Sequence, residues 1–338
     1  MKKTIRDIAN ACGVSVSLVS RIINNDPSLK CKQETKNKVM MEVEKQAFIP
    51  DQNARVLANN SFKNKKNIRI GYITYKGGVL PMNPYFDKVV EGITVILAEQ
   101  GCQVYRYYVD EVNELSRLKR PMESFKFDGL IVFGNLHQKL VEYIKTQTKY
   151  ISSIYGDIIE DADFVGSDIL TTMNTMLDYV KSLGYEEIGL VSGGDEAREE
   201  QLMLHLEKIG MRIADKYFIN AGNENAKAYK IISGIIKETL PPRVICCMND
   251  EMAIGTMNAL LDGGYRVPED VSVTGHDDIT KASYSKVPLT TVKIYKEEIG
   301  RLVTDLLLER IIYRRKFPVK VTVPCALAIR ESLIKNKG

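Results

Sequence analysis

The chain has 338 residues and a net charge of +4, with 44% hydrophobic and 27% charged residues. This length predicts two or three domains. No apolar run approaches the roughly 20 residues that span a bilayer, and the N-terminus lacks the apolar segment of a signal peptide, so we expect a cytoplasmic protein without a membrane partner. Six scattered cysteines with no C-x-x-C pair and three histidines argue against a disulfide framework and a metal site. No cofactor is expected.

The first 24 residues predict two short helices separated by a tight turn. Thr4 and Asp7 stand at capping-box spacing at the start of the first helix, and Gly13 frees the backbone where that helix must stop. Ser15 then caps a second helix. Two capped helices joined in this way are the pattern of a helix-turn-helix DNA reader. The outward face of the second helix consists of Val16, Ser17, Ser20, Arg21 and Asn24.

The distribution of charge favours DNA binding over the alternative, a small helical pair without a ligand. Residues 1–66 hold 13 Lys and Arg against 6 Asp and Glu, a balance of +7, so the other 272 residues carry a net −3. A basic unit joined to a mildly acidic body is the distribution expected of phosphate binding.

Three further segments complete the N-terminal part. Apolar residues at helical spacing predict a third helix over 33–47, which Pro50 keeps from continuing. The octet 51–58 is compatible with a helix but too short to be stable alone. We expect it to form a hinge helix only when a symmetry mate braces it on DNA, with Leu57 wedged between base pairs; a disordered tether is the alternative. The polar stretch 59–67 is predicted to be a linker.

From residue 68 onward, short apolar strands alternate with amphipathic helices, which predicts doubly wound parallel sheets. Two such series in succession predict two lobes with a cleft between them. Strands are expected at 68–74, 104–108, 130–133, 151–155, 188–191, 217–219, 244–248 and 271–274. Helices are expected around 89–97 and at 173–183, 198–209, 226–239 and 250–261. Segments 290–293 and 319–323, on either side of a helix over 298–313, are expected to cross back between the lobes.

Polar side chains gather where these strands end, which is where open α/β sheets bind ligands. A small polyhydroxylated ligand needs amide, carboxylate and guanidinium groups that bond neighbouring hydroxyls in pairs, and an aromatic face for its apolar side. Helix capping is the alternative role for single members such as Asp250. The candidate ligand contacts are Asn83, Tyr85, Phe86, Asp168, Arg198, Glu224, Asn249 and Asp277.

The motif Thr4-Ile-x-Asp-Ile-Ala, followed by Gly13-Val14-Ser15 and Val19-Ser20-Arg21, resembles the DNA-binding headpiece of the LacI/GalR family of bacterial transcription regulators. The similarity extends over the whole chain. It implies that the second helix reads the major groove and that the octet forms a hinge helix in the minor groove. The DNA-binding residues implied are Thr4, Ser15, Val16, Ser17, Ser20, Arg21, Asn24, Asn53, Ala54 and Leu57. Two positions depart from the family pattern. Asp51 stands where relatives usually have Asn, and Lys32 stands where they usually have Ser or Thr.

The same resemblance also implies roles for the ligand set. Arg198 stands where relatives place the arginine that grips their effector. Further implied contacts are Asp168, Asn249 and Asp277. The chain departs from the family at His276 and Glu224, where relatives carry an aromatic, so Tyr85 or Phe86 is expected to supply the aromatic face.

The fold expected is an α/β chain with a helix-turn-helix headpiece and a periplasmic-binding-protein-like body. The boundaries predicted are 1–58 for the headpiece with its hinge helix, 59–67 for the linker, 68–183 plus 294–323 for the N-terminal lobe, and 184–293 plus 324–332 for the C-terminal lobe.

The function expected is a nucleoid-associated homodimeric repressor that binds double-stranded operator DNA and is released by a small sugar. Residues 24–36 and 192–196 look closest to regulators of β-galactosidase operons, so a galactoside is the first expectation. The alternatives are a regulator with a purine or phosphosugar as corepressor, a sugar-binding or enzymatic module without DNA control, and an architectural DNA-binding protein. No P-loop, G-x-S-x-G or H-E-x-x-H motif occurs, so an enzyme is not expected.

Overall fold

The computed structural model describes residues 5–23, 29, 31–45, 68–75, 84–109, 119, 122–134, 136–156 and 158–336. These residues belong to two compact units, Met1–Lys66 and Asn67–Gly338. Each unit has hydrophobic core clusters of its own. None of the described helices combines the length and apolar character needed to cross a membrane.

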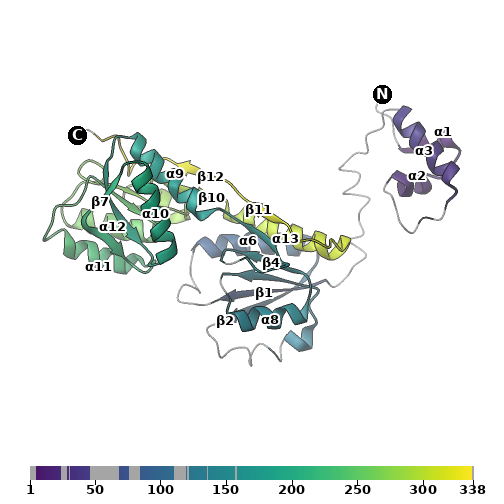
Figure 1. Cartoon of the computed structure of the whole chain (residues 1–338), viewed down its shortest axis with the longest axis horizontal. Coiled ribbons are helices and arrows are strands. Elements are labelled where there is room, and N and C mark those ends of the chain that lie inside the picture. The colour runs from purple at the N-terminus through teal and green to yellow at the C-terminus, as the bar shows by residue number, and fades with distance from the viewer. Residues whose placement is uncertain are drawn as a thin grey trace. The chain divides into compact units, whose positions relative to one another are not determined.

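The first unit contains three described helices, α1 (Ile5–Cys12), α2 (Val16–Ile23) and α3 (Gln33–Lys45) (Figure 1). The chain leaves α1 through Gly13, whose φ of +66° is a left-handed conformation that glycine adopts freely. Ser15 accepts the Leu18 N–H on its hydroxyl at 3.1 Å and so caps α2. The predicted helix-turn-helix is therefore confirmed. Its core consists of Ile8, Ala9, Cys12, Val19, Ile22 and Val39.

Part of the predicted DNA-binding set lies outside the described residues. This applies to the hinge octet and the linker, and to the single residues Thr4, Asn24, Asn53, Ala54 and Leu57.

The body begins with a parallel six-stranded sheet in the order β11-β5-β4-β3-β1-β2. Its strands are β1 (Arg69–Tyr75), β2 (Gln103–Val109), β3 (Gly129–Phe133), β4 (Ile151–Ile154), β5 (Asp163–Gly166) and β11 (Lys320–Thr322). Helices α6 (Pro84–Glu99) and α13 (Lys296–Tyr313) cover one face, and α8 (Gln138–Gln147) covers the other (Figure 1). The strands predicted here are confirmed, whereas β5 and α8 were not predicted.

A second parallel sheet has the order β7-β6-β8-β9. Its strands are β6 (Glu187–Ser192), β7 (Arg212–Asn220), β8 (Val244–Cys247) and β9 (Ser272–Thr274). Its helices are α9 (Ile169–Ser182), α10 (Glu196–Lys208), α11 (Asn225–Ile235) and α12 (Asp250–Asp262), and a 3₁₀ turn spans Thr280–Tyr284. Helices α11 and α12 pack together against the largest cluster of buried side chains.

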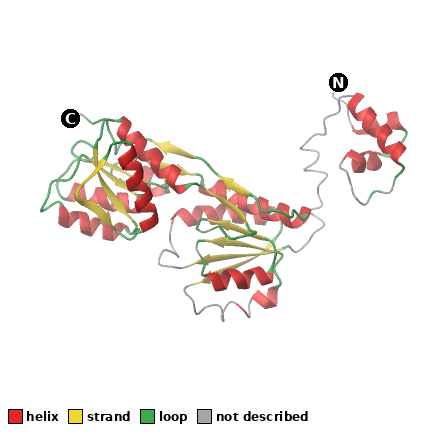
Figure 2. Ribbon diagram, viewed as in Figure 1, coloured by secondary structure: helices red, strands yellow, loops and turns green. Residues whose placement is uncertain are grey.

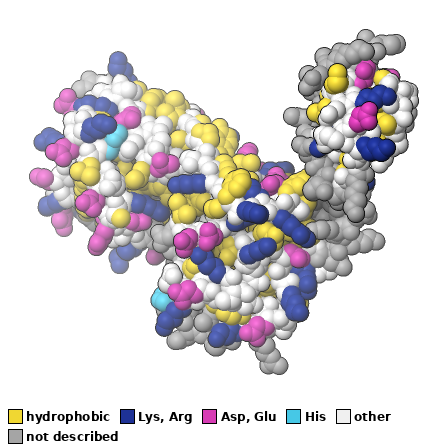
Figure 3. All heavy atoms as spheres, turned by 45° about the vertical axis from the view of Figure 1, so that its right-hand side comes forward, with side chains coloured by type: hydrophobic (Ala, Val, Ile, Leu, Met, Phe, Trp, Pro, Cys, Tyr) yellow, Lys and Arg dark blue, Asp and Glu magenta, His cyan; other side chains and the backbone are white. Residues whose placement is uncertain are grey.

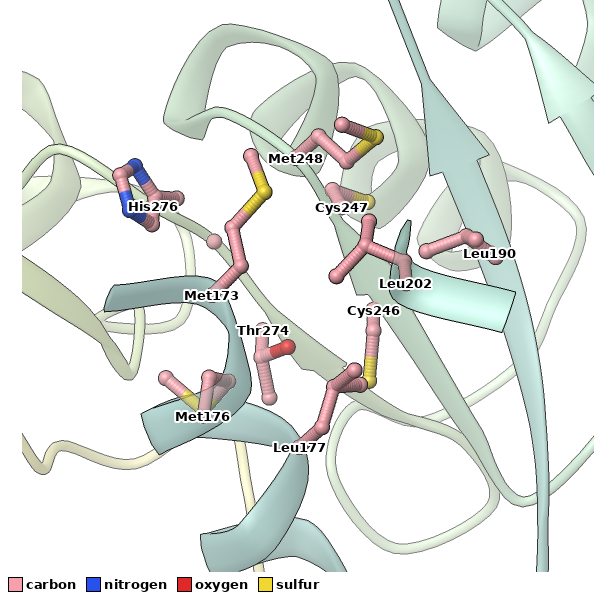
Figure 4. Close-up of a pocket in the computed structure, with 11 residues that line it drawn as sticks. Met173, Met176, Leu177, Leu190, Leu202, Cys246, Cys247, Met248, Thr274 and His276 are labelled. Atoms are coloured by element: carbon pink, nitrogen blue, oxygen red, sulfur yellow. The ribbon is translucent and has the colours of Figure 1, made fainter. Parts of the chain in front are cut away.

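Helix α9 packs with the second sheet. Its Met173 and Leu177 side chains line a small space together with Leu190 of β6 and Leu202 of α10 (Figure 4). The predicted boundary at residue 183 assigns this helix to the first lobe, and these contacts favour counting it with the second. The division of the body into lobes by residue number stays a prediction.

Three chain segments connect the two sheets: β5 to α9, β10 (Thr291–Ile294) to α13, and β11 to β12 (Cys325–Ala328). β10 and β12 pair antiparallel in a ribbon of their own (Figure 2). β11 is held against β5 by the buried Asp163 carboxylate, which accepts two bonds from the Arg315 guanidinium at 2.9 and 3.0 Å and the Val319 N–H at 2.7 Å.

Helices α6 and α13 approach each other more closely than side chains allow. A Cβ atom at Gly92 of α6 would overlap the Glu297 carbonyl, and one at Gly300 of α13 would overlap the Val89 carbonyl. The two glycines thus let the two backbones touch, which places the start of α13 beside α6.

Substituting Gly92→Ala is expected to destabilise the body by about 1–3 kcal/mol, because the added methyl group forces two packed helices apart. Chemical denaturation followed by circular dichroism measures this. The control is Gly234→Ala on α11, where nothing lies within 4 Å of the added Cβ. That change is expected to stabilise by about 0.5–1 kcal/mol through helix propensity. Equal effects at both positions would contradict the close helix contact.

Candidate functional site

The first unit presents the outward face of α2 to solvent. Val19 and Ile22 are buried against the neighbouring helices, while Ser17 and Arg21 are exposed on the opposite side. Val16 is 40% exposed, which is high for an apolar side chain and suits contact with a base methyl group. This arrangement turns one row of side chains on α2 toward solvent.

In the body, Arg198 makes a contact between the two sheets. It lies in the first turn of α10, just after β6, and its Nη2 donates to the Tyr155 hydroxyl at 2.9 Å. Its guanidinium also lies 5.2 Å from the centroid of the Tyr155 ring, and its Nε pairs with Asp195 Oδ2 at 3.0 Å. Because Tyr155 follows β4, the contact brings the carboxyl ends of a strand from each sheet together.

Aromatic rings of α6, the helix on the first sheet, lie next to this contact. Phe86 packs edge-on against Tyr85 at 5.2 Å and against Tyr155 at 5.9 Å between ring centroids. Burial raises the pKa of Tyr85, and the nearby Asp277 carboxylate raises it further. Tyr85 therefore remains a neutral hydroxyl near Asp277 and Arg198, and the group offers both aromatic faces and hydrogen-bonding atoms.

Asp277 enters from the loop after β9. Its φ of +112° and that of Asp278, +55°, are unusual for residues other than glycine. Its Oδ1 lies 3.1 Å from His276 Nδ1, and His276 Nε2 lies 2.8 Å from the Thr172 hydroxyl at the start of α9. Because that hydroxyl donates its hydrogen to the Ile169 carbonyl at 2.8 Å, it accepts from the imidazole.

The other predicted ligand contacts stand at helix starts. Asp168 caps α9 by accepting from the Thr171 N–H and hydroxyl, at 3.3 and 2.8 Å. Asn249 caps α12 through the Met252 N–H at 2.8 Å, and Glu224 occupies the cap position of α11 without a side-chain cap bond. Asn83 lies outside the described residues. Tyr85, Phe86, Arg198 and Asp277 thus form one group, and the ligand roles of all eight stay predictions.

The suggestion that Asp250 caps a helix is wrong, because Asn249 is the cap of α12. Asp250 is instead fully buried and accepts bonds from the Thr291 hydroxyl at 2.6 Å and the Ile279 N–H at 2.7 Å. Burial and the neighbouring Asp277 carboxylate raise its pKa well above the usual value. The carboxyl group therefore braces the loop that carries Asp277.

Two residues of the group were missed by sequence reasoning. The sequence shows Tyr155 only as the last residue of a predicted strand. An aromatic residue at a strand end carries no local signal that it bonds an arginine. Lys296 lies before the helix start expected at 298, and its Nζ donates to the backbone carbonyls of Asp277 and Asp278. No local pattern distinguishes that lysine from an exposed one.

A separate cavity lies between α9, α10 and the second sheet (Figure 4). Its volume of about 20 Å³ suits one water molecule. Its lining is mostly apolar, with Met173, Met176 and Cys246 among its side chains, so it does not suit a hydroxylated ligand. Burial raises the pKa of the Cys246 thiol to about 11, which keeps it protonated and unreactive.

On the face shown in Figure 3, charged side chains are scattered, with Lys and Arg interspersed among Asp and Glu. Within the part of the chain that is described, no three His, Cys, Asp or Glu side chains are grouped so that they could hold a metal ion.

Two family models match the chain. The model described as "Bacterial regulatory proteins, lacI family" matches residues 4–51, which contain the helix-turn-helix, and that of the "Periplasmic binding protein-like domain" matches residues 177–333. The chain belongs to the lacI family of bacterial regulatory proteins. As a member of this family it is a DNA-binding transcriptional regulator, so the predicted family and fold class are confirmed.

Relatives of this lacI-family chain match it from end to end. The HTH-type transcriptional repressor MelR of Bacillus subtilis (strain 168) is 28% identical over 97% of this chain and 96% of its own length. The HTH-type transcriptional repressor PurR of Pasteurella multocida (strain Pm70) is 26% identical over 98% of both chains.

Solved structures show the same fold as this lacI-family chain. The transcriptional regulator CelR in complex with cellobiose has a TM-score of 0.68 at 20% identity and covers 98% of this chain and 99% of its own. The lac repressor dimer bound to operator and an anti-inducer has a TM-score of 0.63 at 21% identity and covers 99% and 100%.

Substituting Ser15→Ala removes the cap of α2 and is expected to lower the free energy of opening this helix by about 1 kcal/mol. Amide exchange over Val16–Ile23 is then expected to be about fivefold faster. Hydrogen exchange of the full chain with mass spectrometry measures this. Ser17→Ala, the same change on the exposed face of the helix, is expected not to speed exchange, because Ala has the higher helix propensity and no cap is lost. The capping role fails if both variants exchange alike.

Proposed function

We propose that this regulator is a homodimeric repressor of a sugar-utilisation operon, released from its operator by a galactoside-like sugar bound between the two lobes. The observation that carries this proposal is that Tyr85 of α6 and Tyr155 after β4, on the side of the first sheet, meet Arg198 of α10 and Asp277 after β9, on the side of the second. A ligand at this point touches both sheets, so its binding free energy depends on how they are arranged.

On the DNA side, α2 enters a major groove in each half of a pseudo-palindromic operator. The outward residues of α2 read base edges, and Ser15 supplies a contact at the helix start. The family resemblance extends this set to Thr4, Asn24 and the hinge residues Asn53, Ala54 and Leu57, with Leu57 as the wedge in the minor groove. The lac repressor dimer on its operator supports two copies per site.

On the ligand side, each group has a chemical role. The Asp277 carboxylate and the Arg198 guanidinium bond adjacent sugar hydroxyls in pairs. Tyr85, Phe86 and Tyr155 provide aromatic faces for the apolar side of the ring. The remaining candidates are Asn83, Asp168, Glu224 and Asn249. The fold of a regulator in complex with cellobiose supports a sugar in such a body.

Release follows from linkage between the two sites. A sugar that prefers one arrangement of the lobes shifts the dimer away from the arrangement that holds the hinge helices on DNA. Couplings of this kind amount to about 1–3 kcal/mol. No cofactor takes part, and we propose a cytoplasmic, nucleoid-associated protein without catalytic activity, consistent with relatives that are named repressors.

The second candidate is a regulator of the same fold whose corepressor is a purine or a phosphosugar. The similarity to the PurR repressor of Pasteurella multocida supports this second candidate. The sign of the response distinguishes the two, because an inducing sugar weakens operator binding and a corepressor strengthens it.

Substituting Arg198→Ala is expected to abolish the sugar response while leaving operator affinity nearly unchanged, because the residue lies among the proposed ligand contacts and not in the headpiece. Fluorescence anisotropy with the DNA upstream of the gene, with and without lactose, galactose and other galactosides, measures both quantities. The control is Arg212→Ala, whose side chain is 78% exposed on β7 and pairs with Glu187.

Wild-type and Arg212→Ala protein are expected to release the DNA with the same sugar. Loss of operator binding in the Arg198→Ala variant would make Arg198 a structural residue and contradict the ligand site. Tight operator binding that no sugar weakens would turn the ligand search to purines and phosphosugars. The absence of specific DNA binding in the wild type would refute the regulator itself.

Substituting Arg21→Ala is expected to cost about 1–3 kcal/mol of operator affinity and to relax sequence preference at one base pair, as for an arginine that bonds a guanine edge. Binding to a set of operators with single base changes measures this. Arg21→Lys keeps the charge and loses the bidentate fork. Wild-type operator affinity and base preference in Arg21→Lys would show that Arg21 contacts a phosphate instead of a base edge.

A further inference from the structure

The turn that carries Asp277 is held in a conformation that its residues do not favour. Asp277 and Asp278 have φ values of +112° and +55°, in the region that favours glycine. Such backbone conformations persist only where the surroundings enforce them, and they cluster at functional sites.

The Lys296 ammonium lies under the turn. Lys296 is only 7% exposed, and its Nζ donates to three backbone carbonyls, those of Asp277, Asp278 (3.1 Å) and Ile294 (3.2 Å). An ammonium group has three N–H donors. All three are therefore taken by the backbone, and none remains for a ligand.

The charges around Lys296 suit this position. Three carboxylates face it, Asp250 from α12 and Asp277 and Asp278 from the turn, while Lys293 of β10 opposes it. The Tyr85 ring of α6 packs on it at 5.9 Å from the ring centroid, and Asp278 is paired with Arg330 at 2.6 Å. Burial lowers the pKa of Lys296 from its usual value, and the carboxylates oppose that change.

We propose that Lys296 is a positioning residue: its ammonium clamps the 277–278 turn so that the Asp277 carboxylate is presented to the sugar. This inference rests on the proposed function, since it assigns Asp277 to the effector. It differs from a direct ligand contact because Lys296 acts only through the backbone. Lys296 is also the first residue of α13, where the chain leaves the second sheet for the first.

The test compares Lys296→Met, which keeps an unbranched side chain of similar length but removes the three bonds, with Lys293→Met on the neighbouring strand. Lys293 is exposed and lies over the Tyr295 ring. Titration calorimetry of the full-length protein with lactose as probe is expected to give at least about tenfold weaker binding for Lys296→Met. Lys293→Met and operator affinity without sugar are expected to stay unchanged.

A pH profile separates positioning from simple support of the fold. The protonated ammonium makes all three bonds, so lactose affinity is highest below the lowered pKa of Lys296 and falls as pH rises through it. Wild type is expected to lose affinity at a pH below the usual lysine pKa of about 10.4, because burial lowers the pKa of Lys296. Lys293→Met is expected to keep this loss at a higher pH, because it removes a like charge that lowers the same pKa. Lys296→Met is expected to lack this loss. An unchanged profile in Lys296→Met would overturn the proposal.

Hydrogen exchange without any sugar makes the outcome independent of the ligand. Amides of residues 277–279 are expected to exchange faster in Lys296→Met than in wild type or Lys293→Met. Unchanged exchange would overturn the proposed role of Lys296, whether or not lactose binds the wild type. Failure of lactose to bind the wild type would count only against the proposed galactoside. Faster exchange with unchanged lactose affinity would overturn the link to Asp277.

If Lys296→Met does not fold, Lys296→Gln replaces it. The glutamine amide keeps two donors but no charge, so a smaller loss of lactose affinity without the pH dependence is expected. Wild-type affinity in that variant would refute the role of the ammonium.

Discussion

Every pairing in the two larger sheets is parallel, and this constraint decides where chemistry gathers in the body. A parallel sheet sends the loops after its strands to a single edge. Tyr155 follows a strand of the first sheet, and Arg198 and Asp277 follow strands of the second. The hydrogen bond between Tyr155 and Arg198 shows that the two edges meet. Residues far apart in the chain thereby become one site.

The side chains of the site are bonded to one another. Arg198 is shared between Tyr155 and Asp195, and the His276 ring is held between Asp277 and Thr172. A ligand must replace such bonds with equally good ones, because a buried polar group that loses its partner costs about 1–3 kcal/mol. This requirement favours a molecule with several closely spaced hydroxyls over one with a single polar group.

Sequence reasoning predicted the elements whose signals are local. Gly13 and Ser15 marked the helix-turn-helix, and alternating strands and helices marked both parallel sheets. β5 was missed because its four residues include the charged Asp163, whose burial makes sense only beside Arg315, more than a hundred positions away. The ligand roles of the site residues stay predictions, and only their positions can be compared with the sequence. Polar residues at strand ends were visible, whereas the place of Lys296 under a turn depends on contacts that no spacing encodes.

The glycine contact between α6 and α13 has a consequence for motion. At Gly92 and Gly300 no side chain separates the two helix backbones. Such a close contact resists the sliding of packed helices by which shear motions occur. We therefore expect Tyr85 on α6 and Lys296 on α13 to move together. If the sheets open relative to each other, we expect a hinge rotation at the three connecting segments that carries the aromatic ring and the ammonium along together.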